Sequence, residues 1–272
     1  MDLHADHLRL DAIADSGQCF RWQPLGEGYR IIASGRVLHA SQRGDRVTLS
    51  CTRRAFDAFW RGYLDLDTDY GAIIAAIPPR DAYLRAAAAH GGGIRILRQE
   101  AWETLITFIL SQRKSIPAIR QGVERLCAAA GRAIGRENGE TLHAFPTPAE
   151  LSALTEEDLR ACGLGYRAPY VRRAAQAFAR GEMDMAALSA LPDEELQAAL
   201  CGLYGVGRKI ALCTMLFGFH RLNAFPVDVW MEKVARFRYP GGIPLADYAP
   251  WGGVMQQYMF AYERALARGN IA

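Results

Sequence analysis

The pattern of apolar and polar positions near the N-terminus predicts a small sheet. Residues 29–33, 36–40 and 46–50 alternate between apolar and polar side chains, and glycine turns separate the three stretches. Alternation with a period of two, broken by glycine turns, is typical of antiparallel strands joined by hairpins. We therefore expect an antiparallel meander here, followed by a helix over residues 52–63.

Helical spacing dominates the remainder of the chain. Apolar residues at every third or fourth position predict a helix over residues 102–111, and a similar pattern predicts the next over residues 116–130. Everything that follows is expected to be helices with short loops. The sequence thus predicts an α+β fold: a small N-terminal domain with an antiparallel β-sheet, residues 1–90, followed by a mostly α-helical domain, residues 91–272.

A glycine turn in the second half of the chain is the most specific pattern. Gly205, Val206 and Gly207 separate one helical pattern from the mostly apolar residues 208–219, which predicts a helix, a hairpin and a second helix. The free N–H groups and the positive dipole end at the start of the second helix suit a phosphate. We therefore expect Gly205, Val206 and Gly207 to bind a phosphate group.

Two residues with useful chemistry follow this turn. Lys209 lies in the first turn of the second helix, and Asp228 comes nineteen residues later, after Pro226. A neutral lysine amine is a nucleophile, and a carboxylate stabilises developing positive charge. Lys209 can also be interpreted as a phosphate-binding cation, and Asp228 as the N-cap of a helix. Only three of the 32 basic residues are lysines, and arginine serves phosphate at least as well, so we favour amine chemistry.

Charge adds a weak preference for a polyanionic partner. The formal net charge is only +3, but residues 91–136 hold eight lysines or arginines against three glutamates. Residues 166–180 hold four arginines and no acid. A basic face on the helical part suits a DNA backbone, and an ordinary solvated arginine face is the alternative. With 272 residues, half of them hydrophobic, the chain is expected to form one or two globular domains.

Cysteine usage and hydropathy argue against several classes of protein. The six cysteines are scattered and form no Cys-x-x-Cys pair, so neither a zinc site nor a disulfide framework is predicted. The N-terminus is charged, and no apolar run approaches the ~18 residues that a membrane helix needs. We expect a soluble monomer in the cytoplasm, associated with the nucleoid in a prokaryote, with no membrane partner.

The hairpin segment closely resembles the helix–hairpin–helix DNA glycosylases, whose signature is a Leu-x-Gly-Val-Gly-x-Lys hairpin followed by Pro-Val-Asp. Within that superfamily the match is best to the 8-oxoguanine DNA glycosylase branch. The resemblance implies that Lys209 attacks the sugar C1′ and forms a Schiff base, while Asp228 stabilises the charge on the sugar. No cysteine follows Cys213, so the iron–sulfur cluster of the endonuclease III relatives is not expected. The resemblance also implies no catalytic metal or redox cofactor, and a structural monovalent cation at the hairpin carbonyls.

Four further residues are implied to form the base pocket. The segment Ser16-Gly17-Gln18-Cys19-Phe20-Arg21-Trp22 alone predicts a turn that enters a strand, with Phe20 and Trp22 packed on one face. It also resembles a family segment in which the glycine carbonyl accepts from N7–H, a proton that guanine lacks. By the same resemblance Cys213 and Phe260 form the pocket walls, and Gln256 hydrogen-bonds the base edge. Without it, both walls are more simply interpreted as core residues.

The implied DNA contacts include departures from the family pattern. Tyr166 would wedge into the base stack and Arg167 would contact the partner base, although a packed core tyrosine is the plainer interpretation of Tyr166. Arg113 occupies the position that contacts the orphaned cytosine, where the family has asparagine. Ala118 stands where the family has a cytosine-reading arginine, so recognition of the opposite base is expected to be looser. Trp230 replaces a histidine that meets phosphate.

Together these features predict a bifunctional base-excision glycosylase and lyase. It would bind duplex DNA that contains a damaged purine such as 8-oxoguanine, extrude that base, release it, and cleave the strand by β-elimination. One alternative is a monofunctional glycosylase for alkylated or deaminated purines, which shares the aspartate but lacks the lysine. The other is a non-catalytic DNA-binding protein, in which Asp228 would have no use.

Overall fold

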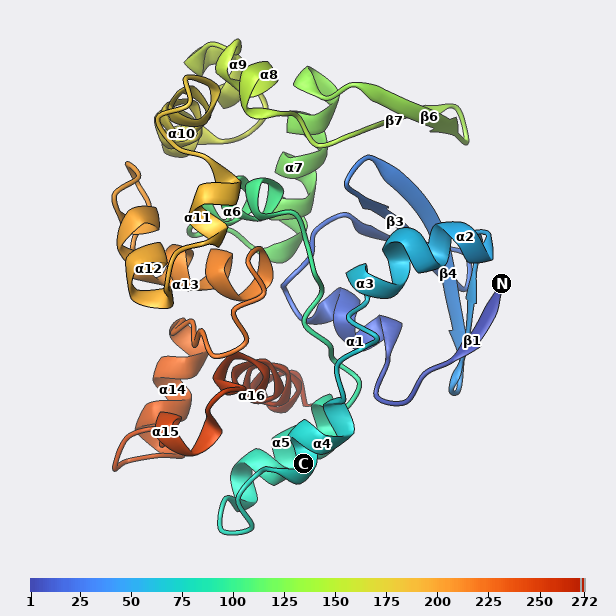
Figure 1. Cartoon of the computed structure of the whole chain (residues 1–272), viewed down its shortest axis with the longest axis vertical. Coiled ribbons are helices and arrows are strands. Elements are labelled where there is room, and N and C mark those ends of the chain that lie inside the picture. The colour runs from blue at the N-terminus through green and yellow to red at the C-terminus, as the bar shows by residue number, and fades with distance from the viewer. Residues whose placement is uncertain (270, 272) are drawn as a thin grey trace.

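The N-terminal part of the chain folds around an antiparallel sheet in the order β1–β5–β4–β3–β2 (Figure 1). The computed structural model describes residues 1–269 and 271. The predicted meander is confirmed as β3, β4 and β5, whose register pairs Ile31 with Leu38 and Ala40 with Leu49. Two outer strands complete the sheet, whose members are β1 (Asp2–His4), β2 (Trp22–Leu25), β3 (Gly28–Ala33), β4 (Arg36–Arg43) and β5 (Arg46–Leu49).

A short helical run covers one face of this sheet. The predicted helix over residues 52–63 consists of α2 (Arg53–Ala55), a π-helical turn η1 (Phe56–Trp60) and α3 (Arg61–Tyr63). Buried side chains of η1 and α3 share one core with the sheet and α1 (Leu10–Asp15). The indole N–H of Trp22 donates to the Tyr63 hydroxyl at 2.8 Å within this core.

Phe20 and Trp22 do not share a face, so that prediction was wrong. Trp22 begins β2 and lies in the sheet core, whereas Phe20 precedes the strand and packs edge-on against Phe108 of the helical core, with ring centroids 5.9 Å apart. Arg21 separates the two cores. It is only 3% exposed and its Nε donates to Glu124 at 2.9 Å. Strand alternation therefore starts at residue 22, one residue after the chain passes between the cores.

Helices build the larger core, with α6 and α13 near its centre. The two helices predicted after residue 100 are confirmed with nearly the same bounds. The division of the chain at residue 90 stays a prediction; in the packing, Leu84 and Ala87 of α5 join the helical core. The remaining helical segments are α4 (Tyr70–Ala75), α5 (Ala82–Gly91), α6 (Ala101–Ser111), α7 (Ile116–Ala130), α8 (Pro148–Ser152), α9 (Glu156–Ala161), η2 (Gly165–Arg167), α10 (Ala168–Ala179), α11 (Met185–Ser189), α12 (Asp193–Cys201), α13 (Arg208–Phe217), α14 (Val229–Phe237), α15 (Leu245–Tyr248) and α16 (Gly252–Ala267).

One element contradicts the prediction of helices and loops alone. Strands β6 (Ala133–Glu137) and β7 (Glu140–His143) form a hairpin whose turn is Asn138-Gly139, both with positive φ. Asn-Gly is the strongest short hairpin signal, and it is present in the sequence. The hairpin extends from the helical part toward the sheet (Figure 1), where Glu137 pairs with Arg30 at 2.9 Å and with His39 at 2.7 Å.

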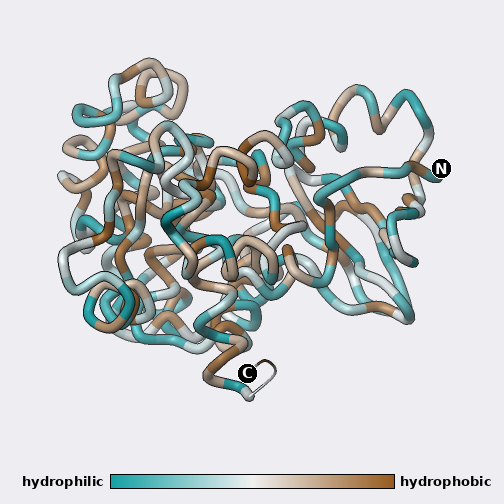
Figure 2. The backbone as a smooth tube through the Cα atoms, turned by 90° about the horizontal axis from the view of Figure 1, so that it is seen from below, coloured by the Kyte–Doolittle hydropathy of each residue, from teal (hydrophilic) through white to brown (hydrophobic). Residues whose placement is uncertain are grey.

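Hydropathy along the chain follows this arrangement. In Figure 2 the sheet and the helical part lie on opposite sides of the view, and hydrophobic segments alternate with hydrophilic ones along both. Among the described residues, no helix combines the length and the apolar character that crossing a membrane requires.

Candidate active site

The glycine turn forms the predicted hairpin between α12 and α13. Gly205 has φ +82°, a value that favours glycine, and the N–H of Val206 donates to the Leu203 carbonyl at 3.0 Å. The N–H groups of Gly205 and Gly207 have no acceptor within the described part of the chain. They stand just before the N-terminus of α13, where unpaired donors and the helix dipole attract an anion.

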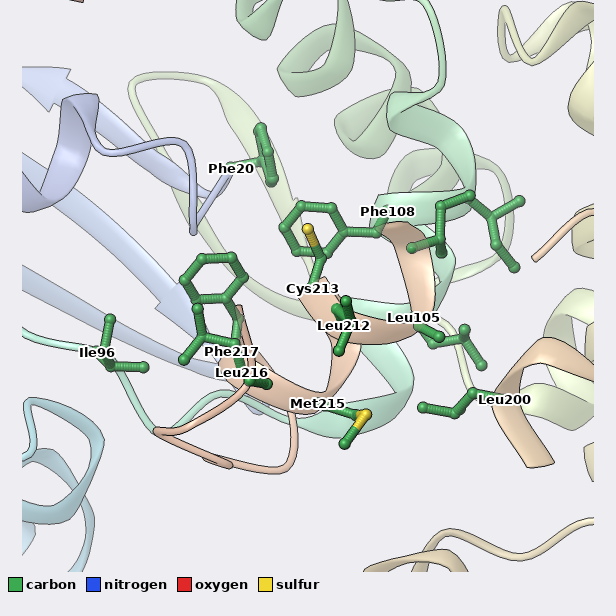
Figure 3. Packing of buried hydrophobic residues seen from close by; sticks show 14 of the residues in the cluster. Phe20, Ile96, Leu105, Phe108, Leu200, Leu212, Cys213, Met215, Leu216 and Phe217 are labelled. Atoms are coloured by element: carbon green, nitrogen blue, oxygen red, sulfur yellow. The ribbon is translucent and has the colours of Figure 1, made fainter. Parts of the chain in front are cut away.

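Lys209 lies in the first turn of α13 and lines a cavity of about 300 Å³. The side chain is half-buried, and its Nζ lies 5.1 Å from the centroid of the Phe108 ring. Phe108 in turn stacks on Phe217, with centroids 5.5 Å apart. An aromatic pair thus lies beside the amine, and Figure 3 shows Phe20, Phe108 and Cys213 close together in the core that lines this cavity.

Asp228 lines the same cavity and caps α14. One carboxylate oxygen, Oδ1, accepts from the N–H groups of Trp230 and Met231, each at 3.0 Å. These bonds fix the carboxylate at the helix N-terminus, where the dipole favours negative charge. Asp228 is therefore the N-cap of α14, as one interpretation predicted, and the same residue also lines the cavity.

Gly17 lies in a turn that contacts Phe260 and is anchored by the hydrogen bonds of Gln18. Its φ is +75°, and a Cβ added there would lie 3.6 Å from the Phe260 ring. The neighbouring Gln18 is buried: its amide donates to the Arg95 carbonyl at 2.9 Å and accepts from the N–H of Leu97 at 2.9 Å. The Gln18 amide therefore anchors the Gly17 turn to the backbone of Arg95 and Leu97.

The pocket residues expected from the second half of the chain also meet at this cavity. Cys213 lies one turn after Lys209 on α13, while Gln256 and Phe260 lie one turn apart on α16. Burial raises the pKa of the Cys213 thiol, and the nearby Lys209 opposes that shift. Arg264 braces the far wall, because its guanidinium stacks 5.1 Å from the Phe260 ring centroid and donates to Asp15, beside the Gly17 turn.

A second lysine lines the cavity, which the sequence did not suggest. Lys114, between α6 and α7, donates from Nζ to the Gly163 carbonyl at 2.6 Å. Burial, together with the charges of Arg167 and Arg125, lowers the pKa of Lys114. Its amine is nevertheless held by a carbonyl, so Lys209 is the better placed nucleophile.

A row of three tyrosines, exposed at its two ends and half-buried in the middle, runs from η2 to the hairpin. Tyr166 is 50% exposed and meets Tyr170 edge-on at 6.0 Å, and Tyr170 meets Tyr204 at 5.1 Å. The guanidinium of Arg173 lies 4.1 Å above the centroid of the Tyr204 ring. The exposure of Tyr166 agrees with a wedge and disagrees with a packed core tyrosine.

The loop between α6 and α7 carries Arg113, exposed and with φ +52°. Arg167 differs from expectation in its placement: it is 6% exposed and donates to the Leu164 and Gln112 carbonyls. A contact with a partner base therefore requires Arg167 to leave these carbonyls. Gln112 also donates to the Gly205 carbonyl at 3.2 Å, which ties this loop to the hairpin.

Ala118 and Trp230 are the two other residues that differ from the family pattern. Ala118 is half-buried on α7. Trp230 lines the cavity and carries the Lys233 ammonium 4.6 Å from its ring centroid, so a cation stands near the position where the family histidine meets phosphate. Among the described residues, no group of three or more His, Cys, Asp or Glu side chains could hold a metal ion.

Comparisons with known proteins agree with this arrangement. Residues 1–105 match the model of the 8-oxoguanine DNA glycosylase N-terminal domain, and residues 106–239 match the HhH-GPD superfamily of base excision DNA repair proteins. The chain is 39% identical to the N-glycosylase/DNA lyase of Saccharomyces cerevisiae over 267 residues, which covers 87% of this chain and 70% of the yeast protein.

A second relative and a solved structure extend the comparison. The chain is 31% identical to a probable N-glycosylase/DNA lyase of Methanothermobacter thermautotrophicus, covering 63% of this chain and 64% of the archaeal protein, slightly under two thirds of its length. An 8-oxoguanine glycosylase/lyase of Clostridium acetobutylicum, solved with duplex DNA that has cytosine opposite 8-oxoguanine, superposes with a TM-score of 0.89 at 32% identity. That match covers 98% of this chain and 94% of the other.

Proposed function

Since the chain belongs to the 8-oxoguanine DNA glycosylase branch of the helix–hairpin–helix (HhH-GPD) superfamily, we propose that it is a bifunctional DNA glycosylase and lyase for oxidised purines. One observation carries the proposal: a single cavity is lined by Lys209 and Asp228 together with all four predicted base-pocket residues, Gly17, Cys213, Gln256 and Phe260. These residues come from four separate parts of the chain. Neither a purely structural core nor a non-catalytic protein that binds only the DNA backbone requires an amine, a carboxylate and an amide to line one cavity.

Lys209 is the proposed nucleophile. Its neutral amine attacks the sugar C1′ while the C1′–N9 bond breaks, and the base leaves with the bonding electrons and takes up a proton. Opening of the sugar ring gives a Schiff base between Nζ and C1′. Loss of a proton from C2′ then expels the 3′ phosphate, which cleaves the strand. Asp228, fixed by its cap bonds, stabilises the positive charge on the sugar.

The base pocket supplies recognition. The flipped purine would lie between Cys213 and the Phe260 ring, with the Gly17 carbonyl accepting from N7–H of 8-oxoguanine. The Gln18 bonds anchor the Gly17 turn, and the Arg264–Asp15 contact joins that turn to α16, which carries Gln256 and Phe260. A hydrogen bond that only the lesion completes gives strong discrimination against guanine.

The partner is double-stranded DNA, and the protein acts as a cytoplasmic monomer. The unpaired hairpin N–H groups would bind phosphate, Tyr166 would wedge beside the flipped base, and Arg113 would face the orphaned base. Because Ala118 offers no hydrogen bond to that base, we expect looser selection of the opposite base. The carbonyls of Leu203 and Gly205 accept one bond each and keep a second lone pair, which suits a structural monovalent cation.

Borohydride trapping on a duplex that contains 8-oxoguanine tests the proposal. A covalent adduct that is lost in Lys209→Gln and kept in Lys114→Gln supports it, because both lysines line the cavity but only Lys209 is free of a carbonyl partner in the described residues. Base release without an adduct would instead identify a monofunctional glycosylase. Binding without base release would identify a DNA-binding protein and refute the proposal.

A further inference from the structure

Two adjacent glutamines on α16 form a buried pair at the cavity. Gln256 and Gln257 are each 3% exposed, and both line the cavity. The amide Nε2 of Gln257 donates to Oε1 of Gln256 at 2.9 Å. The Oε1 atom of Gln257 is buried and has no hydrogen-bond partner among the described residues. Leaving a buried acceptor unpaired is costly, so this amide is positioned for a reason other than stability.

The bond between the two amides gives Gln256 a definite orientation. An amide accepts through its oxygen and donates through its nitrogen. Since Oε1 of Gln256 receives the Gln257 donor, its NH₂ group is left without a partner in the described residues and is the donor that the pair offers to a ligand. Rotating both amides by 180° would leave both N–H donors of Gln257 without an acceptor, whereas the observed arrangement leaves one of these donors and the Oε1 acceptor unpaired among the described residues.

Orientation matters because a free glutamine reads two kinds of purine edge. In one orientation its amide donates to O6 and accepts from N1–H, the edge of guanine. In the other it accepts from an exocyclic N6–H and donates to N1, the edge of adenine. A glutamine that can rotate therefore recognises both 6-oxo and 6-amino purines, whereas a fixed one recognises a single class.

We propose that Gln257 is a positioning residue that determines specificity: by donating to Gln256 it holds that amide with its NH₂ group toward O6 of the flipped base, so the pocket accepts 6-oxo purines and rejects 6-amino purines. The second lone pair of Gln256 Oε1 accepts from N1–H of the same base. This assignment rests on the proposed function, since it concerns the base that the enzyme releases.

Two variants of nearly equal shape test the assignment. Gln257→Glu has only acceptor oxygens when ionised, so it draws the NH₂ group of Gln256 toward itself and turns the Gln256 oxygen to the base. Gln257→Met is apolar, unbranched and of similar length, so it removes the constraint without imposing another. Met259→Leu, buried on the same helix but absent from the cavity lining, is the matched control.

The measurement is single-turnover base release at pH 8 from two duplexes that differ only in carrying 8-oxoguanine or 8-oxoadenine opposite cytosine. The ratio of the two rates should favour 8-oxoguanine in the wild type and in Met259→Leu. We expect it to fall at least about tenfold in Gln257→Glu and to move toward one in Gln257→Met. Both substrates meet the same protein, so a loss of folded enzyme lowers both rates and leaves the ratio unchanged.

If release is too slow to follow, competition between the two duplexes for binding, in a Lys209→Gln background, gives a ratio of affinities that should change in the same direction. A ratio that stays at the wild-type value in both Gln257 variants overturns the assignment while the glycosylase function stands. A wild type that neither releases base nor forms a borohydride adduct on either duplex overturns the proposed function, and the assignment with it.

Discussion

Replacing the first hairpin glycine should damage the protein far more than replacing the second. Gly205 has φ +82°, and a Cβ added there would lie 2.3, 2.5 and 2.7 Å from three carbons of the Tyr170 ring. Gly207 has φ −91°, and among the described residues nothing lies within 4 Å of its added Cβ. The same methyl group therefore meets a ring at one position and open space at the other.

The magnitude follows from two contributions at Gly205→Ala. A left-handed conformation costs a non-glycine residue roughly 1–2 kcal/mol, and overpacking against a fixed ring costs about 1–3 kcal/mol more. Tyr170 has little room to move, since Tyr166 and Tyr204 contact it from two sides. We expect Gly205→Ala to lose about 2–5 kcal/mol of unfolding free energy and Gly207→Ala to lose less than about 1 kcal/mol.

Urea unfolding of both variants measures the difference directly. A double-mutant cycle with Tyr170→Ala isolates the contact with the ring: in that background Gly205→Ala should cost only the conformational share, about 1–2 kcal/mol. Equal losses for the two glycine variants, or a loss at Gly205 that is the same with and without the Tyr170 ring, would refute the reasoning.

Three further predictions concern charge. Asp228→Asn keeps the cap bonds but loses the charge, so its unfolding free energy should stay within about 1 kcal/mol of wild type while single-turnover base release falls about 10²–10³-fold. Asp228→Ala also loses the cap bonds and should lose about 0.5–2 kcal/mol more of unfolding free energy. Full activity in the Asn variant would contradict the electrostatic role. Burial raises the pKa of Glu103 from 4.5 to about 7, so the folded state binds this proton more tightly and stability should fall as pH rises from 4.5 to 7. Glu103→Gln should remove that fall, worth at most about 3 kcal/mol between unfolding free energies at pH 5 and pH 8, and an unchanged pH profile would contradict it. Arg173→Ala should lower the slope of log Kd for duplex DNA against log salt concentration by about 0.9. The control is Arg43→Ala, which should leave the slope unchanged because the wild-type Arg43 side chain pairs with Glu27 beside the sheet. Equal slopes in the two variants would show that Arg173 does not contact phosphate.

Elements that depend on a few neighbouring residues could be predicted from the sequence. The hairpin and the N-cap at Asp228 lie in one short stretch whose glycine and cap requirements are set by backbone geometry, so spacing predicts both, whereas the roles of Lys209 and Asp228 come from the family resemblance. The antiparallel meander was equally predictable, because the alternation of apolar and polar residues and the glycine turns are patterns that extend over only a few residues.

The parts that depend on distant packing were not predictable in the same way. Phe20 and Trp22 enter different cores because buried Arg21 pairs with Glu124, about a hundred residues away in sequence. Arg167 is buried because the Leu164 and Gln112 carbonyls accept hydrogen bonds from its guanidinium, and no local sequence pattern predicts this position. The β6–β7 hairpin is different, since its Asn-Gly turn is a local signal that the sequence contains, between segments with helical spacing. Gln257 gave no signal at all, because a buried glutamine has no characteristic spacing.

The wall that carries Gln256 and Phe260 belongs to α16, which follows the hairpin and α13 in the chain. During synthesis the hairpin and Lys209 therefore leave the ribosome before this wall does. Until α16 docks, a growing chain presents the glycine turn while the cavity still lacks one side.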